Sequence, residues 1–192
     1  MPASSLSLDE GEVREIIHDL LSHILEKNGF NIENFIPNSS PDIKLVHVRQ
    51  TVDALIEDSS ELFYNLGEQL HLNSDNIHAI FFGISDEIFV TGINWGRIVA
   101  FLAFGGTVAV HCASDTELCD ILNEIPTWMT DYVEGNLRQW IDAHGGWKGF
   151  VTFFKLSGAN GQLDLKNWSL FALFGFSIGA LLVFATKNIP QY

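Results

Sequence analysis

Cations are scarce in this sequence. Its 192 residues include 10 lysines and arginines against 24 aspartates and glutamates, which gives a formal net charge of −14. A protein that binds nucleic acid needs a basic face to neutralise phosphates, so this balance argues against a nucleic-acid partner. Cysteine is nearly absent too, since only Cys112 and Cys119 occur and no second pair stands at ligand spacing. They indicate ordinary thiols in a reducing compartment, and neither a disulfide framework nor a metal site.

Catalytic patterns are also missing. The seven histidines are scattered singly, and the sequence has no HExxH motif, no glycine-rich phosphate loop and no paired acids in an apolar setting. These are arrangements on which many hydrolases, metalloenzymes and nucleotide-binding enzymes depend. We therefore expect a protein that is not an enzyme and that uses no cofactor and no metal.

The stretch from residue 87 to residue 106 organises the chain. Thr91 and Gly92 interrupt a helical pattern, and Asn94 is suited to cap the next helix by accepting a hydrogen bond from a free backbone N–H. Residues 98–104 are then apolar in every direction around a helical turn. Because no face of such a helix suits water, the sequence predicts a helix that is enclosed on all sides.

One cation, Arg97, stands at the mouth of this apolar segment. The helix dipole disfavours positive charge on the first turn, so the guanidinium is misplaced there unless a carboxylate meets it. That carboxylate could come from the chain itself, as Asp86 or Glu87, or from a partner. The pattern leaves both possibilities open.

The remaining periodicity predicts an all-α protein. Apolar residues recur at helical spacing in three stretches before Asn94, which indicates amphipathic helices that pack around the apolar one. These stretches contain Val13, Ile16, Ile17, Leu20, Leu21 and Ile24; Leu62, Phe63, Leu66 and Leu70; and Ile77, Ile80, Phe81, Ile84 and Ile88. Gly29 marks the end of the first helix, and the proline-containing residues 31–41 predict a loop.

Two predicted helix boundaries follow the apolar helix. A capping box at residues 114–117 predicts a helix through Leu118 and Ile125 that Pro126 ends or bends. Gly145 and Gly146 predict a break, after which residues 147–150 fold back as a short lid helix with Trp147 in the core.

The end of the chain has the composition of a membrane span. No charged residue occurs between Lys166 and Lys187. A run of about 20 uncharged residues is the length that a helix needs to cross a bilayer. Trp168 and the flanking cations suit the membrane interface. We expect residues 1–157 to form one helical domain, residues 158–166 a linker and residues 167–187 a C-terminal transmembrane anchor. The alternative, a buried amphipathic helix, finds no polar face to support it.

Two ordered motifs carry a family resemblance. The run from Asn94 to Arg97, followed by residues 98–101 and closed by Phe104-Gly105-Gly106, resembles the first homology motif of the Bcl-2 family of apoptosis regulators. Residues 140–154, WIDAHGGWKGFVTFF, resemble the second motif, and residues 14–30 resemble the fourth in the form that survival-promoting members carry. The resemblance covers most of residues 13–192. It implies a Bcl-2-like bundle in which amphipathic helices wrap a central apolar helical hairpin.

The resemblance also implies a site. In the family, a hydrophobic groove receives the amphipathic third-motif helix (BH3) of a partner, in the helix-in-groove mode. By position, Arg97 would pair with the Asp of that helix, with Asn94 beside it and Gly96 leaving room for close approach. The remaining assigned residues are Leu55, Leu62, Phe63, Leu66, Ile84, Ile88, Val99, Ala100 and Phe104 in the groove, Phe154 at one end, and Glu87.

The chain's own third motif is degenerate. Asp53 takes the place of the motif's acid, but Val52 stands where the family has a small residue, and two of the four apolar positions are not apolar. Bulk at the small position would hold this helix away from a partner's groove. We expect Val48, Val52 and Leu55 to pack inside the protein instead.

Two functions follow from the resemblance. The first is an anti-apoptotic protein that sequesters the BH3 helices of pro-apoptotic relatives, both Bak- or Bax-like and BH3-only proteins, and so prevents permeabilisation of the mitochondrial outer membrane. The second is a pore-forming, Bak-like effector whose central helix leaves the core and oligomerises in that membrane. The degenerate third motif and the first-helix match favour the first. The implied location is cytosol-facing on the mitochondrial outer membrane, with the endoplasmic reticulum as the alternative.

Overall fold

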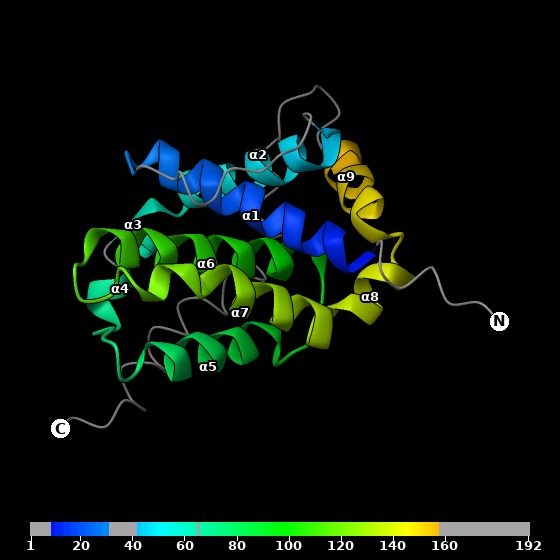
Figure 1. Ribbon diagram of the computed structural model, residues 1–192. Helices are drawn as coiled ribbons and strands as arrows, with labels where there is room; N and C mark the ends of the chain where they lie inside the picture. The colour runs from blue at the N-terminus through cyan, green and yellow to red at the C-terminus, as the bar shows by residue number, and fades with distance from the viewer. Residues whose placement is uncertain (1–8, 31–41, 65, 158–192) are drawn as a thin grey trace.

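All regular elements in the described part of the chain are helical. The computed structural model describes residues 9–30, 42–64 and 66–157 (Figure 1). In chain order the elements are α1 (Asp9–Lys27), α2 (Ile43–Asp58), α3 (Ser60–Phe63), α4 (Leu66–Gln69), α5 (Ile77–Phe89), α6 (Trp95–Ser114), the 3-10 turn η1 (Ile121–Asn123), α7 (Ile125–Tyr132), the π-helical turn η2 (Val133–Leu137), α8 (Arg138–Ala143) and α9 (Gly146–Ser157). The predicted all-α class is confirmed.

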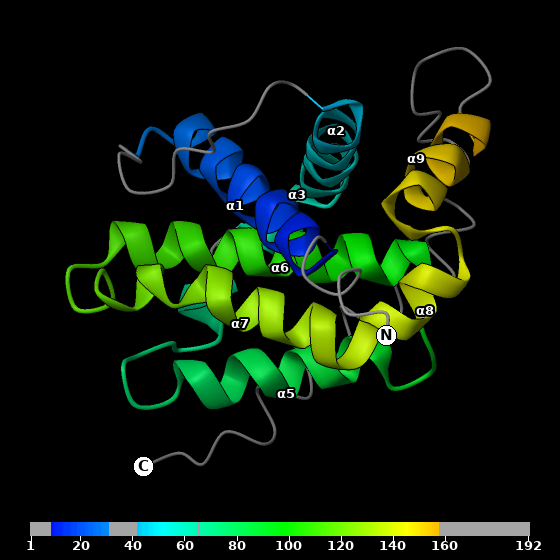
Figure 2. The same ribbon diagram turned by 45° about the vertical axis from the view of Figure 1, so that its right-hand side comes forward.

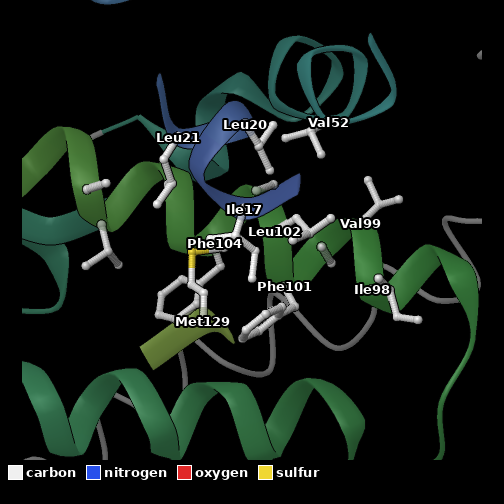
Figure 3. Close-up of a cluster of buried hydrophobic side chains, with 14 of the residues drawn as sticks. Ile17, Leu20, Leu21, Val52, Ile98, Val99, Phe101, Leu102, Phe104 and Met129 are labelled. Atoms are coloured by element: carbon white, nitrogen blue, oxygen red, sulfur yellow. The ribbon is translucent and has the colours of Figure 1, made fainter. Parts of the chain in front are cut away.

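Helix α6 is the centre of the fold. Every residue from Ile98 to Gly106 is buried, and the helix packs against α1, α2, α4, α5 and α7. In Figures 1 and 2, α1 and α2 lie on one side of α6 and α5 lies on the other, with α7 alongside. Figure 3 shows side chains of α1, α2, α6 and α7 meeting in this core. The prediction that this helix is enclosed on all sides is confirmed.

The first amphipathic helix also behaves as its spacing predicts. The apolar stripe from Val13 to Ile24 is buried against the core, and Leu25 extends it. Gly29 follows α1 with φ of +85°, a left-handed value that favours glycine, and its N–H bonds to the carbonyl of Glu26 at 2.9 Å. This glycine therefore ends the helix, as expected.

The apolar face predicted from Leu62 to Leu70 is divided between two short helices. Tyr64 has extended backbone with ψ of 126°, so the hydrogen-bond ladder stops at α3 and starts again at α4. Phe63 and Leu66 are still buried. The periodicity located the buried side chains correctly but missed the break between them.

The role predicted for Pro126 is wrong. Residues 118–120 form a turn, η1 follows, and α7 begins at Ile125 with Pro126 in its first turn. Proline suits that position because its missing N–H would have no intrahelical acceptor there anyway. Pro126 therefore opens a helix, whereas the sequence pattern predicted that it would end or bend one.

Helices α8 and α9 hold the start of α6. Gly145 and Gly146 have φ of +88° and +62°, which confirms the predicted break, and Trp147 is buried as expected. Trp95, the first residue of α6, meets the ring of Trp140 edge-on with centroids 5.0 Å apart. It also meets Phe150 edge-on at 5.5 Å. These aromatic contacts fix the end of α6 that carries the Asn94–Arg97 motif.

Three segments on which predictions were made lie outside the described residues. They are the loop at residues 31–41, the linker at residues 158–166 and the membrane anchor at residues 167–187.

A glycine in α9 provides a test of this packing. A Cβ added to Gly149 would overlap the backbone carbonyl oxygen of His144, which cannot move aside as a side-chain tip can. We expect Gly149→Ala to lower the free energy of unfolding by about 1–3 kcal/mol, the usual cost of overpacking. Urea unfolding of the full chain, followed by circular dichroism, measures the change.

The matched control is Gly83→Ala in α5. A Cβ at Gly83 meets nothing within 4 Å, so alanine should raise stability by about 0.5–1 kcal/mol through its helix preference. Equal effects of the two substitutions would contradict the close approach of α9 to the preceding turn.

Candidate functional site

The first turn of α6 is capped as the sequence predicts. Asn94 has extended backbone, with φ of −154° and ψ of 166°, and its side-chain oxygen accepts a hydrogen bond from the N–H of Arg97 at 2.9 Å. The cap satisfies one of the backbone donors that a helix leaves free at its start. It also fixes the backbone of the residue that carries the guanidinium.

The Arg97 guanidinium is held in the turn between α5 and α6. Its Nη1 donates to the carbonyl oxygen of Gly92 at 2.6 Å, and its Nη2 donates to the hydroxyl of Thr91. The side chain is half-buried, whereas Thr91 and Gly92 are exposed. Neither of these two acceptors is a carboxylate. Sequence reasoning placed both residues in the turn before the capped helix but missed that they accept hydrogen bonds from Arg97.

Asp86, one of the two acids that could have met Arg97, is engaged elsewhere. Its carboxylate accepts a hydrogen bond from the hydroxyl of Tyr132 on α7 at 3.0 Å. Burial and this bond to a carboxylate raise the pKa of Tyr132, so the tyrosine remains a neutral donor. Glu87, the other acid, is half-buried near the end of α5.

The predicted apolar site residues converge from six helices. They are Leu55 on α2, Leu62 and Phe63 on α3, Leu66 on α4, Ile84 and Ile88 on α5, Val99, Ala100 and Phe104 on α6, and Phe154 on α9. Leu62 is half-buried and the others are buried, with no more than 9% of any of them exposed. All of them except Leu62 belong to the core cluster in this structure, and their role as a binding surface stays a prediction.

Aromatic rings stiffen the part of this cluster between α5 and α6. The rings of Phe81 and Phe104 stack with centroids 5.4 Å apart. On the same helices, Phe101 and Phe89 both stack on Tyr132, at 5.0 and 5.9 Å. Phe154 packs on Phe150 at 4.6 Å within α9. Rigid rings of this kind hold the apolar side chains of the cluster in defined positions.

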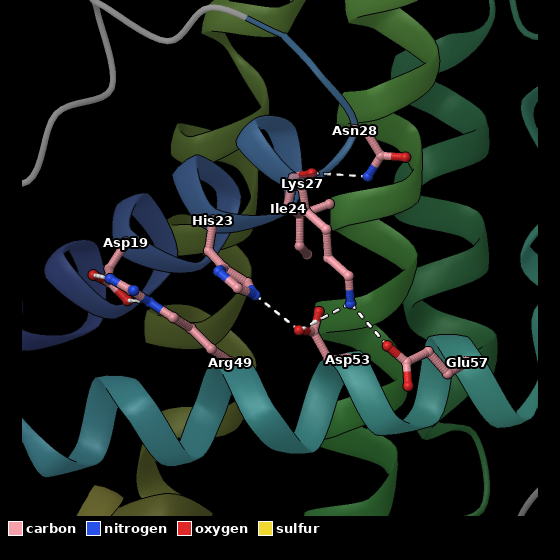
Figure 4. A network of polar contacts seen from close by, with 8 residues as sticks. All are labelled: Asp19, His23, Ile24, Lys27, Asn28, Arg49, Asp53 and Glu57. Carbon is pink, nitrogen blue, oxygen red and sulfur yellow. Dashed lines mark hydrogen bonds and ion pairs between the residues drawn. The ribbon is translucent and has the colours of Figure 1, made fainter.

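Helix α2, which carries the degenerate third motif, packs its apolar side chains into the core. Val48, Val52 and Leu55 are buried, which confirms that they pack inside. Asp53 lies 2.8 Å from Nε2 of His23 and 3.1 Å from Nζ of Lys27, both on α1 (Figure 4). The acid of the motif is therefore directed at α1.

Further ion pairs join α1 and α2 along their length. Arg49 bonds to both carboxylate oxygens of Asp19, with Nε at 2.6 Å from Oδ2, and Lys27 bonds to Glu57 at 2.9 Å. The bond to Glu57, together with the neighbouring Asp53, raises the pKa of Lys27. Sequence reasoning missed these pairs. The sequence does place opposite charges 30 positions apart. That spacing predicts a pair only when it is known that the two helices pack side by side.

No metal site is evident among the described residues. Within residues 9–30, 42–64 and 66–157, the His, Cys, Asp and Glu side chains form no group of three or more that could hold a metal ion. What the arrangement offers chemically is one oriented guanidinium beside a cluster of apolar side chains.

The fold and the site define a helical-bundle protein built around one apolar helix that opens with an anchored arginine. Residues 48–147 match the apoptosis regulator proteins of the Bcl-2 family. Since that match covers more than half of the chain, the chain belongs to the Bcl-2 family of apoptosis regulators.

Individual relatives agree with this assignment. The chain is 37% identical over 107 residues to apoptosis regulator Bcl-2 of Gallus gallus, covering 56% of this chain and 46% of that protein. It is 37% identical over 112 residues to Bcl-2-like protein 1 of Sus scrofa, covering 56% and 48%. The chain thus spans about half the length of the curated relatives it matches.

A solved structure shares the fold. The crystal structure of Trichoplax adhaerens trBcl-2L2 bound to trBak BH3 is similar with a TM-score of 0.70 and 27% sequence identity, over 76% of this chain and 99% of that chain. The expected Bcl-2-like fold with a central apolar helix is confirmed.

The cap of α6 gives a testable prediction. Asn94→Ala removes the acceptor for the N–H of Arg97, so it should lower the free energy of unfolding by about 0.5–2 kcal/mol. Asn94→Ser keeps a capping oxygen and should retain most of that stability. Urea unfolding of the three proteins makes the comparison, and equal loss in both variants would argue against a capping role.

Proposed function

We propose that this chain is a survival-promoting member of its family, which sequesters the BH3 helices of pro-apoptotic relatives. Free effectors would then be unable to permeabilise the mitochondrial outer membrane. The observation that carries the proposal is the Arg97 guanidinium, anchored by a hydroxyl and a carbonyl beside buried apolar side chains. The similarity to a relative solved with a Bak BH3 segment supports the same function.

Binding in this proposal combines two interactions. Apolar side chains of the incoming helix pack against residues of α2 to α6, and its Asp pairs with Arg97. Because those apolar residues are buried in this structure, α3 and α4 must shift away from α6 to admit a helix. Each has only four residues, so moving them breaks few backbone hydrogen bonds.

The state of α2 supports a receiving role over a donating role. A donated BH3 helix would have to expose the side chains that Val52 and its neighbours bury here, and to release Asp53 from His23 and Lys27. Removing one partner from a buried or half-buried ion pair leaves a charge uncompensated, which is costly. The chain therefore suits the role of groove better than the role of ligand.

The proposed location rests on the sequence of the C-terminal segment. Residues 167–187 form an anchor that places the helical domain on the cytosolic side of an intracellular membrane, and the family assignment favours the mitochondrial outer membrane. The endoplasmic reticulum is the alternative destination.

Substitution of Arg97 tests the proposal. Truncating one partner of a desolvated charge pair costs about 2–5 kcal/mol, so Arg97→Ala should weaken BH3 binding by more than about tenfold. Calorimetric titration of the full chain in detergent with a panel of BH3 peptides, including the Trichoplax Bak segment, measures this. Arg97→Lys should lose part of the affinity, because an ammonium keeps the charge but not the planar fork.

The matched control for this experiment is Arg14→Ala. Arg14 is exposed on α1, outside the candidate site. Its substitution by alanine removes the same charge as Arg97→Ala does. It should leave the affinity within about twofold of the wild type, since surface charges contribute little. Unchanged affinity in Arg97→Ala, or an equal loss in both variants, would contradict a specific pair at Arg97.

A second function has one observation in its favour. Among the described residues, α6 alone has the length and hydropathy to cross a bilayer, as a pore-forming effector requires. However, 67% of its most apolar window is buried inside the structure, which a soluble core helix also shows. The survival-promoting function therefore predicts no dye release from liposomes carrying the full chain, before or after addition of BH3 peptide. Robust leakage would reverse the assignment.

A further inference from the structure

Helix α4 approaches the C-terminal end of α6 through a glycine. Gly67 in α4 is buried, and α6 is the helix that α4 packs against most extensively. A Cβ added at Gly67 would overlap the ring of His111, in the last turn of α6, at its Cγ, Nδ1 and Cδ2 atoms. Glycine destabilises a helix relative to alanine, so the close approach gives the physical reason for a glycine at this position.

The imidazole of His111 has little room to move away. Its Cγ is the first atom beyond Cβ, so this atom moves only when χ1 changes, and a helix disfavours one of the three χ1 rotamers. The backbone of His111 is also fixed, because its carbonyl oxygen accepts hydrogen bonds from the hydroxyl of Ser114 at 2.8 Å and from the N–H of Asp115 at 3.2 Å. Helix α4 therefore fits in this position only while residue 67 has no Cβ.

The C-terminal end of α4 is strained. His71 has φ of +50°, a left-handed value that is uncommon outside glycine. Its N–H bonds to the carbonyl of Glu68 at 3.0 Å, and the N–H of Leu72 bonds to the carbonyl of Gly67 at 3.1 Å. From the side of α5, Nδ2 of Asn76 donates to the carbonyl oxygen of His71 at 3.0 Å. Such strain persists only when neighbouring contacts impose it, so release of α4 from α6 would allow His71 to relax.

We propose that the contact between Gly67 and His111 is a latch that holds α4 closed on α6 and sets the affinity for a partner helix. Leu66, next to Gly67, is buried and is one of the residues assigned to the site, so a partner reaches it only when α4 moves. A protein whose binding-competent state is sparsely populated binds with an affinity reduced by that fraction, so a tighter latch weakens binding. The control of affinity rests on the proposed function, whereas the latch itself is a property of the fold.

Substitutions on both sides of the contact separate the latch from general stability. Gly67→Ala places a Cβ against the imidazole, which destabilises the closed position of α4 and leaves the open position unaffected. His111→Ala removes the ring, so a Cβ at residue 67 no longer meets it. The matched control is Ile17→Val, which removes one methyl group from a fully buried side chain of α1.

The first measurement needs no partner. The N–H groups of residues 70–72 bond to the carbonyls of residues 66–68, so their hydrogen exchange reports the opening of α4. In the full chain in detergent, these amides should exchange about tenfold faster in Gly67→Ala than in the wild type, as an overpacked contact requires. In Ile17→Val they should stay within about twofold of the wild type, because the methyl group lies in another helix.

The second measurement is calorimetric titration of the same proteins with the Trichoplax Bak BH3 peptide. Gly67→Ala should lower the dissociation constant by about threefold to tenfold, because less free energy is needed to open α4. Ile17→Val should leave it within about twofold of the wild type. Gly67→Ala introduced into His111→Ala should change it by less than about twofold, because the two residues act through one contact.

The outcomes distinguish this inference from the function on which it rests. Exchange at the wild-type rate in Gly67→Ala would overturn the latch and leave the proposed function standing. Faster exchange with an unchanged dissociation constant, or an equal gain in affinity in Ile17→Val, would overturn its control of binding. If the wild type binds no BH3 peptide, the proposed function fails and the control of affinity with it, while the exchange comparison still decides whether α4 is latched.

Thermal unfolding of each variant shows whether a folded protein is being compared. If Gly67→Ala does not fold, His111→Ala alone provides the test, because it removes the surface on which α4 rests. It too should speed exchange at residues 70–72 and lower the dissociation constant, and wild-type values of both would overturn the proposal.

Discussion

The enclosure of α6 is the constraint on which the rest of the structure depends. A helix that is apolar in every direction gains about 1.5–3 kcal/mol for each large side chain it buries and has no face left for water. Helices α1, α2, α5 and α7 therefore surround it. Its N-terminus must still reach the surface, and there the chain places a polar turn, a cap and one cation. The candidate site lies where the buried helix begins.

Ion pairs between α1 and α2 add to the contacts that apolar burial makes between these helices. Packing buries one face of α2, and the contacts of Asp19 with Arg49 and of Asp53 with His23 and Lys27 join that helix to α1 in one register. Such pairs are weak evidence for stability and better evidence for a specified arrangement. Their effect here is to turn the third-motif acid toward α1, which gives α2 a structural role in this protein.

The candidate site likewise combines buried apolar side chains with polar groups close to the surface. The apolar side chains assigned to it, except Leu62, are part of the core cluster, and the polar groups at the start of α6 are half-buried or exposed. A partner helix would therefore find its charge contact already oriented and its apolar contacts still covered. In the proposed binding mode the ion pair orients the encounter, and the affinity depends on how readily α3 and α4 give way.

Local features of the fold and of the site were predictable from the sequence. The apolar run of α6, the stripe of α1, the cap at Asn94 and the break at Gly145 depend on neighbouring residues, and each was predictable from them. The folded structure was needed to find the interruption at Tyr64, the opening role of Pro126, the partners of Asp53 and the contacts of Arg97 with Thr91 and Gly92. Helical periodicity reports which side of a helix is buried. It does not report which distant atoms meet that side, because this depends on how segments far apart in the chain pack together.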